Sequence, residues 1–175
     1  TIEVLVNDKI ITNYDIIQRI KISAIIRGIN ITDQNFNTIT NSVTDELINE
    51  ILKMEKVKEY EIDITVDEYK NHEKRFLENF DYSKSEIQNI FSLNNVSYNN
   101  FKDQLEIDLK WQKLIYGLYL RVTSVTDTEI NSLLESDASL SKEMAEDIIL
   151  QKQLDLKSSK LINDLRDEAT IEFKQ

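Results

Sequence analysis

The residue types that carry most enzyme chemistry are scarce in this chain of 175 residues. His72 is the single histidine, and there is no cysteine. These counts exclude disulfides, catalytic thiols and zinc sites with two histidines, such as the H-E-x-x-H motif. A hydrolytic triad would need His72 as its base. We interpret His72 as a packed or boundary residue, because it shares one helical face with Tyr69, Phe76 and Phe80. Catalysis and a pH-sensitive or client contact are the alternatives.

Other patterns for binding ions or phosphates also lack residues that they require. The acidic stretch EYEIDITVDE, residues 59–68, has neither the turn glycine nor the bidentate glutamate of an EF-hand loop. Gly28 and Gly117 are the only glycines, and two isolated glycines cannot form a phosphate-binding loop. The sequence therefore predicts a protein that is not an enzyme, with no catalytic residue, no metal site and no cofactor.

The net charge of −11 disfavours two classes of partner. Nucleic acids and anionic membrane surfaces both attract basic proteins, so we expect neither as a partner. The longest apolar run, LIYGLYL, is far shorter than the ~18 to 20 residues of a membrane span, so we expect no membrane insertion.

Aromatic residues crowd the middle of the chain and are the best candidates for binding. They are Phe76, Phe80, Tyr82, Phe91, Tyr98, Phe101, Trp111, Tyr116 and Tyr119. They either form the core or line a groove that holds apolar segments of other proteins. We predict contact with such segments for the four near helix ends, Phe80, Tyr82, Phe91 and Tyr98. Trp111 is predicted to belong to the core.

The elements that position these residues are predicted to be mainly helices. The chain has no proline, so few residues interrupt a helix. The spacing of a capping box, in which a serine or threonine stands three positions before an acidic residue, occurs at Thr12, Thr65, Ser83 and Thr126. With the apolar periodicity, these signals predict helices over about 13–27, up to about 60, from 66, from 84, over about 98–121, from 127 and from about 144.

The apolar stripes indicate which helix faces are buried. Val43, Leu47, Ile51 and Met54 form a predicted core-facing stripe. The helix over 98–121 has two stripes, so we expect it to be surrounded by protein and central. Phe101, Leu105, Leu109 and Tyr116 form the first stripe, and Ile107, Trp111, Leu114 and Leu118 form the second.

Both ends of the chain have the alternating pattern of strands. Residues 2–6 alternate and run into Asn7-Asp8, which suits a two-residue hairpin turn. Residues 170–174 alternate again. Because a lone hairpin is marginally stable, we predict that the C-terminal strand joins it in a small antiparallel sheet. The predicted fold is thus mainly α, with a small sheet formed by both termini.

Four segments in this order resemble the SurA-type periplasmic chaperones. They are VLVNDKIITNYDIIQRI, VTDELINEILKMEKVKEYEIDITVDEY, NNVSYNNFKDQLEIDLKWQKLIYGLYLRVTSVTDTEINSLL and LINDLRDEATIEFK. The resemblance implies a SurA-like N-terminal helical domain over 1–134 and a C-terminal helix and strand over 144–175 that pack back on it as one structural unit. The short linker over 135–143 stands where the family carries parvulin prolyl isomerase domains, and it leaves no room for one.

The resemblance also implies a function. The chain is expected to be an ATP-independent periplasmic holdase, with its signal peptide removed, that binds unfolded outer-membrane proteins or aromatic-rich peptides for delivery to the β-barrel assembly machinery. A non-catalytic module that docks one folded partner is the alternative, and a residual prolyl isomerase is a third. Edge strands at both termini allow a monomer or a domain-swapped dimer.

Overall fold

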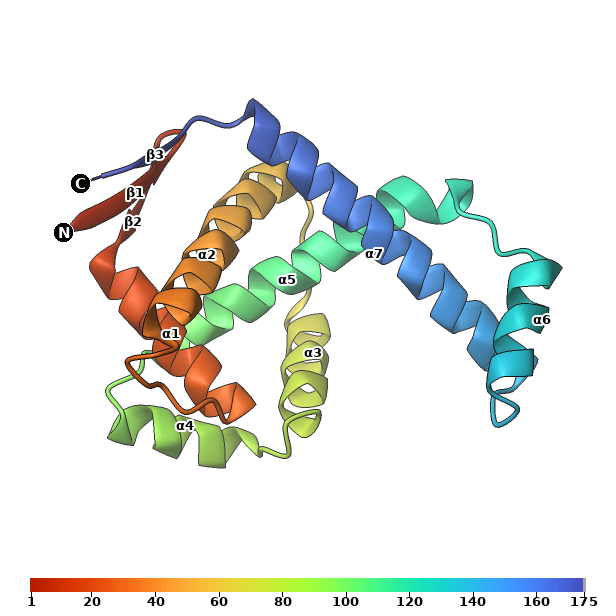
Figure 1. The fold of residues 1–175 in the computed structure, drawn as a ribbon, viewed down its shortest axis with the longest axis horizontal. Coiled ribbons are helices and arrows are strands. Elements are labelled where there is room, and N and C mark those ends of the chain that lie inside the picture. The colour runs from red at the N-terminus through yellow and green to blue at the C-terminus, as the bar shows by residue number, and fades with distance from the viewer. Residues whose placement is uncertain (175) are drawn as a thin grey trace.

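A computed structural model describes residues 1–174 (Figure 1). The elements, in chain order, are β1 (Ile2–Val6), β2 (Lys9–Thr12), α1 (Asn13–Arg27), α2 (Phe36–Glu59), α3 (Val66–Glu78), α4 (Lys84–Leu93), α5 (Tyr98–Tyr119), the short 3₁₀ helix η1 (Leu120–Val122), α6 (Asp127–Ser136), α7 (Lys142–Glu168) and β3 (Ile171–Phe173). The predicted fold class, mainly helical with a small antiparallel sheet from both termini, is confirmed.

The sheet joins the two ends of the chain, which lie side by side in Figure 1. Its strand order is β2-β1-β3, and β1 is antiparallel to both neighbours. Val6 lies opposite Ile171, and the backbone N–H of Asn7 donates to the carbonyl oxygen of Thr170 at 2.8 Å. The C-terminal strand therefore supplies the third strand that the hairpin needs for stability.

Asn7 connects the hairpin turn to two other elements. Its φ of 52° lies in the left-handed region, which asparagine tolerates better than most residues. Its side-chain amide donates to Glu55 of α2 at 2.9 Å, and its side-chain oxygen accepts the N–H of Thr170 at 3.0 Å. One turn residue thus holds the hairpin to a helix and to the C-terminal strand.

The helix starts follow the capping signals of the sequence. All four predicted capping boxes are present, at the N-termini of α1, α3, α4 and α6. Gly28 ends α1 with a φ of 63°, a conformation that glycine adopts without steric cost. Local sequence therefore determines where most helices begin.

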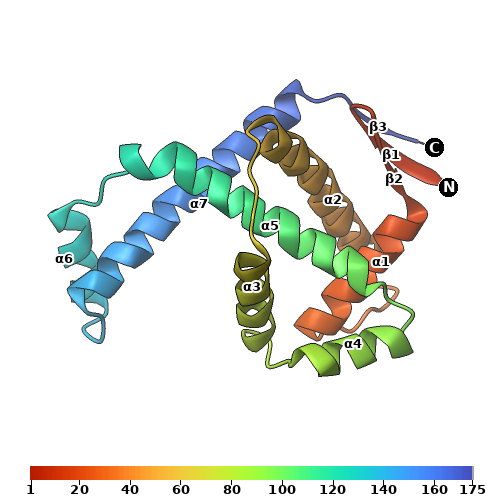
Figure 2. The ribbon, with the colours of Figure 1, turned by 180° about the vertical axis from the view of Figure 1, so that it is seen from behind.

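Four apolar clusters hold the elements together. The sheet packs on α1 and α2, an aromatic cluster joins α1, α3, α4 and α5, and a third cluster joins α2, α5 and α7. A fourth, smaller cluster lies between α6 and α7. Helix α5 contacts α2, α3, α4 and α7, as its two apolar stripes predict (Figure 2). Trp111 is 4% exposed, so its predicted place in the core is confirmed.

Two residues assigned to buried stripes are exposed. Met54 of α2 lies beside the hairpin turn at Asp8 and Lys9, where the covering sheet ends, and it keeps 37% of its surface. Tyr116 of α5 is also exposed, and its hydroxyl donates to Gln151 of α7 at 3.1 Å. Both predicted helices are present. Met54 is exposed because the sheet that covers α2 ends beside it, and Tyr116 meets a polar partner instead of an apolar one.

Deleting residues 170–175 is expected to lower the free energy of unfolding by about 2–4 kcal/mol, because β3 contributes the partly buried Ile171 and several backbone hydrogen bonds. Urea unfolding followed by Trp111 fluorescence measures this change. Glu172→Ala, on the same strand, is the control and should change stability by less than about 0.5 kcal/mol. Full stability after the deletion would show that β3 does not hold the hairpin.

Candidate functional site

The four aromatic residues predicted to bind other proteins lie around one aromatic cluster. The ring centroids of Phe91 and Tyr98 are 6.0 Å apart, and those of Phe76 and Phe80 are 5.2 Å apart with the ring planes tilted by 43°. Phe101 of α5 lies within 5.7 Å of Phe76 and 5.4 Å of Phe91, which connects the two pairs. The structure thus brings residues of α3, α4 and α5 into one aromatic cluster.

These four residues differ in accessibility. Phe91 is 0% exposed, because it and Ile87 form the inward face of the short helix α4. Tyr82 and Tyr98 are half-buried, and Phe80 is exposed at the end of α3. Phe91 is therefore a core residue with no exposed surface that another protein could contact. Contact of Phe80, Tyr82 and Tyr98 with segments of other proteins stays a prediction.

A buried carboxylate ties this cluster together. Glu73 of α3 is only 3% exposed. Its two oxygens accept hydrogen bonds from the hydroxyls of Tyr69 and Tyr98 at 3.1 and 2.8 Å, and from the ammonium of Lys84 at 2.7 Å. Burial alone would raise the pKa of Glu73, but these donors together outweigh it and hold the pKa below its usual value. The carboxylate thus joins α3, α4 and α5.

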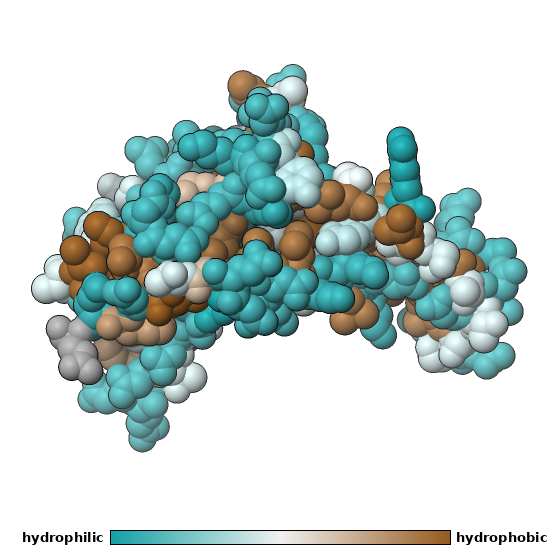
Figure 3. All heavy atoms as spheres, turned by 90° about the horizontal axis from the view of Figure 1, so that it is seen from above, coloured by the Kyte–Doolittle hydropathy of each residue, from teal (hydrophilic) through white to brown (hydrophobic). Residues whose placement is uncertain are grey.

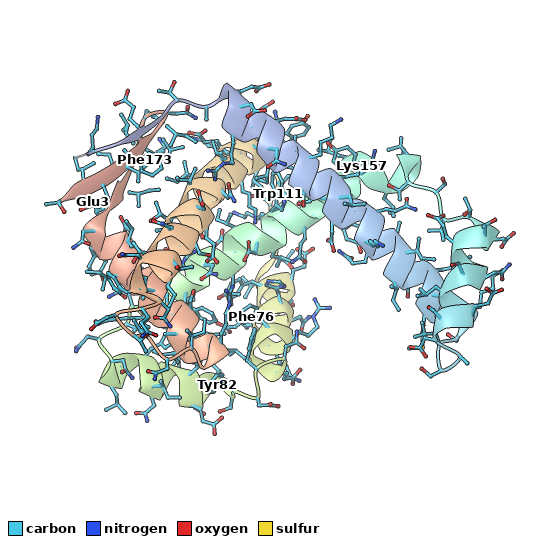
Figure 4. The ribbon with its side chains drawn as sticks, viewed as in Figure 1. Glu3, Phe76, Tyr82, Trp111, Lys157 and Phe173 are labelled. Atoms are coloured by element: carbon cyan, nitrogen blue, oxygen red, sulfur yellow. The ribbon has the colours of Figure 1, made fainter. Side chains whose placement is uncertain are left out.

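A concave surface lies between α3 and the start of α4. It has a volume of about 580 Å³. Leu77 and Tyr82 form its apolar part, and Lys70, Lys74 and Lys84 stand around it. Figure 4 labels Tyr82 near the turn between α3 and α4. Of the four sequence-predicted residues, Tyr82 lines this surface.

A second surface lies on a helical arm that projects from the body. We define the arm as α6 together with the first half of α7, residues 142–156. Figures 1 and 2 show α7 crossing α5 and continuing beyond it to α6. The arm has its own apolar cluster, in which Ile130, Ala145 and Ile149 are buried.

The arm has an open groove between its two helices. We call it the arm groove, and its volume is about 730 Å³. Its lining residues are Thr128, Glu129, Ser132, Leu133 and Ser136 of α6 and Ile148, Ile149, Lys152, Gln153 and Leu156 of α7. Each set repeats at intervals of three to four residues, so each comes from one helical face.

Large apolar side chains in and beside the arm groove face solvent. Ile148 is 45% exposed and Leu156 is 64% exposed. Met144, one helical turn before Ile148, is also exposed. Exposed aliphatic residues that share one concave face are typical of a surface that binds another apolar molecule.

Polar contacts fix the two helices of the arm. The amide of Gln153 donates to Glu129 at 3.1 Å, and Lys142 forms an ion pair with Asp127 at 3.6 Å. At the other end of the arm, Trp111 of α5 donates its indole N–H to Ser158 of α7 at 2.8 Å. Figure 4 labels Trp111 where α5 and α7 cross, and this contact joins the arm to the body.

Sequence reasoning missed the arm groove. In α7, Leu150, Leu154, Leu161 and Leu165 recur at helical spacing and pack toward the body. Met144, Ile148 and Leu156 form a second stripe, displaced around the helix from the first. This spacing was the available signal, but the sequence alone does not show whether another element covers such a stripe.

In the space-filling view, hydrophobic side chains gather at the left end, over the sheet, and recur in smaller groups along the molecule (Figure 3).

Other classes of site find little support in the described part of the chain. Residues 1–174 contain no group of three or more histidine, aspartate or glutamate side chains placed to bind a metal ion. His72 is half-buried, and this burial lowers its pKa. None of the described helices combines the length and apolar character needed to cross a bilayer.

Comparison with known proteins decides the fold. No protein-family model and no curated protein sequence matches this chain. Among solved structures, it matches one described with PEB4 and the periplasmic protein Cj1289, two SurA-like chaperones of Campylobacter jejuni, at a TM-score of 0.58 and 14% identity. The match covers 100% of this chain and 99% of the other.

The fold of this chain is similar to that of this SurA-like structure. At 14% identity, this likeness extends to the fold and to no residue of a site. Because the match covers the whole chain, the SurA-like part includes both the sheet closed by β3 and the arm of α6 and α7.

Replacing Trp111 by alanine is expected to lower the free energy of unfolding by about 3–5 kcal/mol, because a buried aromatic and the hydrogen bond to Ser158 are both lost. Tyr116→Ala on the same helix, where the side chain is exposed, should cost less than about 1 kcal/mol. Urea unfolding followed by circular dichroism measures both variants. Equal costs would contradict the role of Trp111 in joining α5 to α7.

Glu73→Gln is expected to destabilise the protein by about 1–3 kcal/mol at neutral pH, because a buried charged acceptor is lost. The pKa of Glu73 is lower in the folded state, so its stabilisation is present above the usual value of 4.5 and is lost as the pH falls through the folded value. The difference between wild type and variant should therefore shrink below about pH 4.5.

Chemical denaturation at a series of pH values measures this dependence. Glu78→Gln, an exposed carboxylate on the same helix, is the control and should change stability by less than about 0.5 kcal/mol at every pH. If the cost of Glu73→Gln stays constant down to pH 3, Glu73 is not held ionised by its donors.

Proposed function

We propose that this protein is an ATP-independent chaperone that holds unfolded polypeptides. The arm groove carries the proposal. It offers exposed aliphatic side chains to a partner, and its volume of about 730 Å³ is large enough to hold several side chains of another polypeptide. A holdase of this kind needs an apolar surface and a charged exterior. It does not need a reaction centre.

The shape of the arm groove suits an extended or helical segment of another chain. It runs between two helices, which are held together by their own apolar cluster and by the contact between Gln153 and Glu129. Serine and threonine side chains of α6 lie opposite Ile148 and Leu156 of α7. An apolar segment would thus find one aliphatic wall and one polar wall able to satisfy its backbone groups.

The surface between α3 and α4 is proposed as a second contact region. Its apolar part is smaller, and Phe80, Tyr82 and Tyr98 stand near it with part of their surface free. Two separated weak contacts on one chain would increase avidity for a long unfolded partner. The arm groove and this surface together would serve unfolded chains of many sequences.

The proposed location is the periplasm, and the proposed partners are unfolded outer-membrane proteins on their way to the β-barrel assembly machinery. The SurA-like fold supports this, since the solved structure that it matches is described with a periplasmic protein. Between α6 and α7 the structure has only residues 137–141, so a prolyl isomerase domain is not proposed here.

The test is suppression of aggregation. An unfolded outer-membrane β-barrel protein diluted from urea should aggregate more slowly in the presence of the purified chain. The double variant Ile148→Ser/Leu156→Ser should bind this client roughly tenfold more weakly, because two exposed apolar contacts are removed. Light scattering and fluorescence anisotropy measure the two effects.

Leu93→Ser/Val66→Ser is the matched control, since both residues are exposed and apolar but lie on the body. Circular dichroism verifies that all variants are folded. If the wild-type chain fails to slow aggregation, the proposed function is wrong, and a module that docks one folded partner becomes the better account. If both double variants lose equal activity, the arm groove is not the binding surface.

A further inference from the structure

We infer that the arm groove selects polypeptide segments that combine lysine or arginine with aliphatic side chains. This inference rests on the proposed function, and it specifies the chemical class of segment that the groove holds. It is carried by the distribution of charge around an open apolar surface.

The arm is more acidic than the rest of the chain. Residues 127–156, the arm with its connecting loop, have eight carboxylates and two lysines, whereas the whole chain has 32 acidic and 21 basic residues. The carboxylates are Asp127, Glu129, Glu135, Asp137, Glu143, Glu146, Asp147 and Asp155, and the lysines are Lys142 and Lys152. All of the eight except Glu146 belong to exposed residues. A segment in the groove therefore lies in a negative field.

Two of these carboxylates stand at the rims of the arm groove. Glu135 lies seven positions after Thr128 on α6, and Asp155 lies seven positions after Ile148 on α7. Seven residues are nearly two helical turns, so each carboxylate lies close to the groove-lining face of its helix. The two rims, one on each helix, are thus both acidic.

The negative charges of the two rim carboxylates are available to a basic partner. Lys152 and Glu129 both line the groove, so their charges offset each other. Lys142 is paired with Asp127. Among the salt bridges within residues 1–174, none involves Glu135 or Asp155, and Asp155 accepts only the neutral amide of Gln151 at 2.8 Å.

The apolar and acidic features act on different parts of a partner. The aliphatic side chains of a segment would lie against Ile148 and Leu156, while its basic groups would reach the rims. Exposed charge pairs add little individually and are screened by salt, so they govern selection more than affinity. An acidic segment with the same aliphatic residues would be repelled from both rims.

A pair of peptides tests this inference on the full chain. Both have the same length and the same leucines and isoleucines, but one has three lysines where the other has three glutamates. In fluorescence anisotropy at low salt, the basic peptide should bind roughly tenfold more tightly, and most of this advantage should disappear at about 0.5 M salt. Glu135→Gln/Asp155→Asn should reduce this advantage at low salt at least threefold, because several weak charge–charge interactions between the rims and the lysines of the peptide are lost.

Asp33→Asn/Glu61→Gln is the matched control, because it removes two exposed carboxylates of the body and should leave the advantage unchanged. Equal binding of the two peptides would overturn the inference and leave the proposed function standing. An advantage that survives in Glu135→Gln/Asp155→Asn would overturn the assignment to the rims. If neither peptide binds, the inference is overturned, and the aggregation assay decides separately on the proposed function.

Discussion

The pairing of β3 with β1 is the interaction on which the rest of this structure depends. It brings residues more than 160 positions apart into one sheet and gives the hairpin the third strand that it needs. Asn7 extends the junction to α2. Because β3 follows α7 directly, this pairing also fixes the end of the longest helix. The position of α7, and through it the arm, is therefore determined from the C-terminal end.

The arm follows from how α7 is held. Its second half packs on α2 and α5, where Trp111 and Ser158 meet. Its first half touches α5 through Leu150, Leu154 and Gln151, and packs on α6 through Ala145 and Ile149. Helix α6 packs on Ala145 and Ile149 of α7, while Met144, Ile148 and Leu156 stay exposed. The same long helix thus closes the core at one end and presents an apolar surface at the other.

Much of the fold could be predicted from the sequence, because short-range signals determine it. Capping boxes such as Thr65 with Glu68 mark the helix starts, and alternation marks the strands. The candidate site could be predicted only in part. Phe91 carries the same local pattern as its exposed neighbours, and its burial depends on α5. Likewise, α5 and α7 each have two apolar stripes. Both stripes of α5 are largely covered by other helices, whereas the second stripe of α7 faces solvent, because elements distant in the sequence determine which stripes are covered.

Site-specific photo-crosslinking tests the central claim, that unfolded chains bind in the arm groove, most directly. A benzophenone amino acid would replace Ser132, which lines the groove, or Ser42, which is exposed on α2 away from both proposed contact regions. After irradiation with an unfolded β-barrel protein, the account predicts strong crosslinking from position 132 and little from position 42. Strong crosslinking from position 42 with none from position 132 would contradict it.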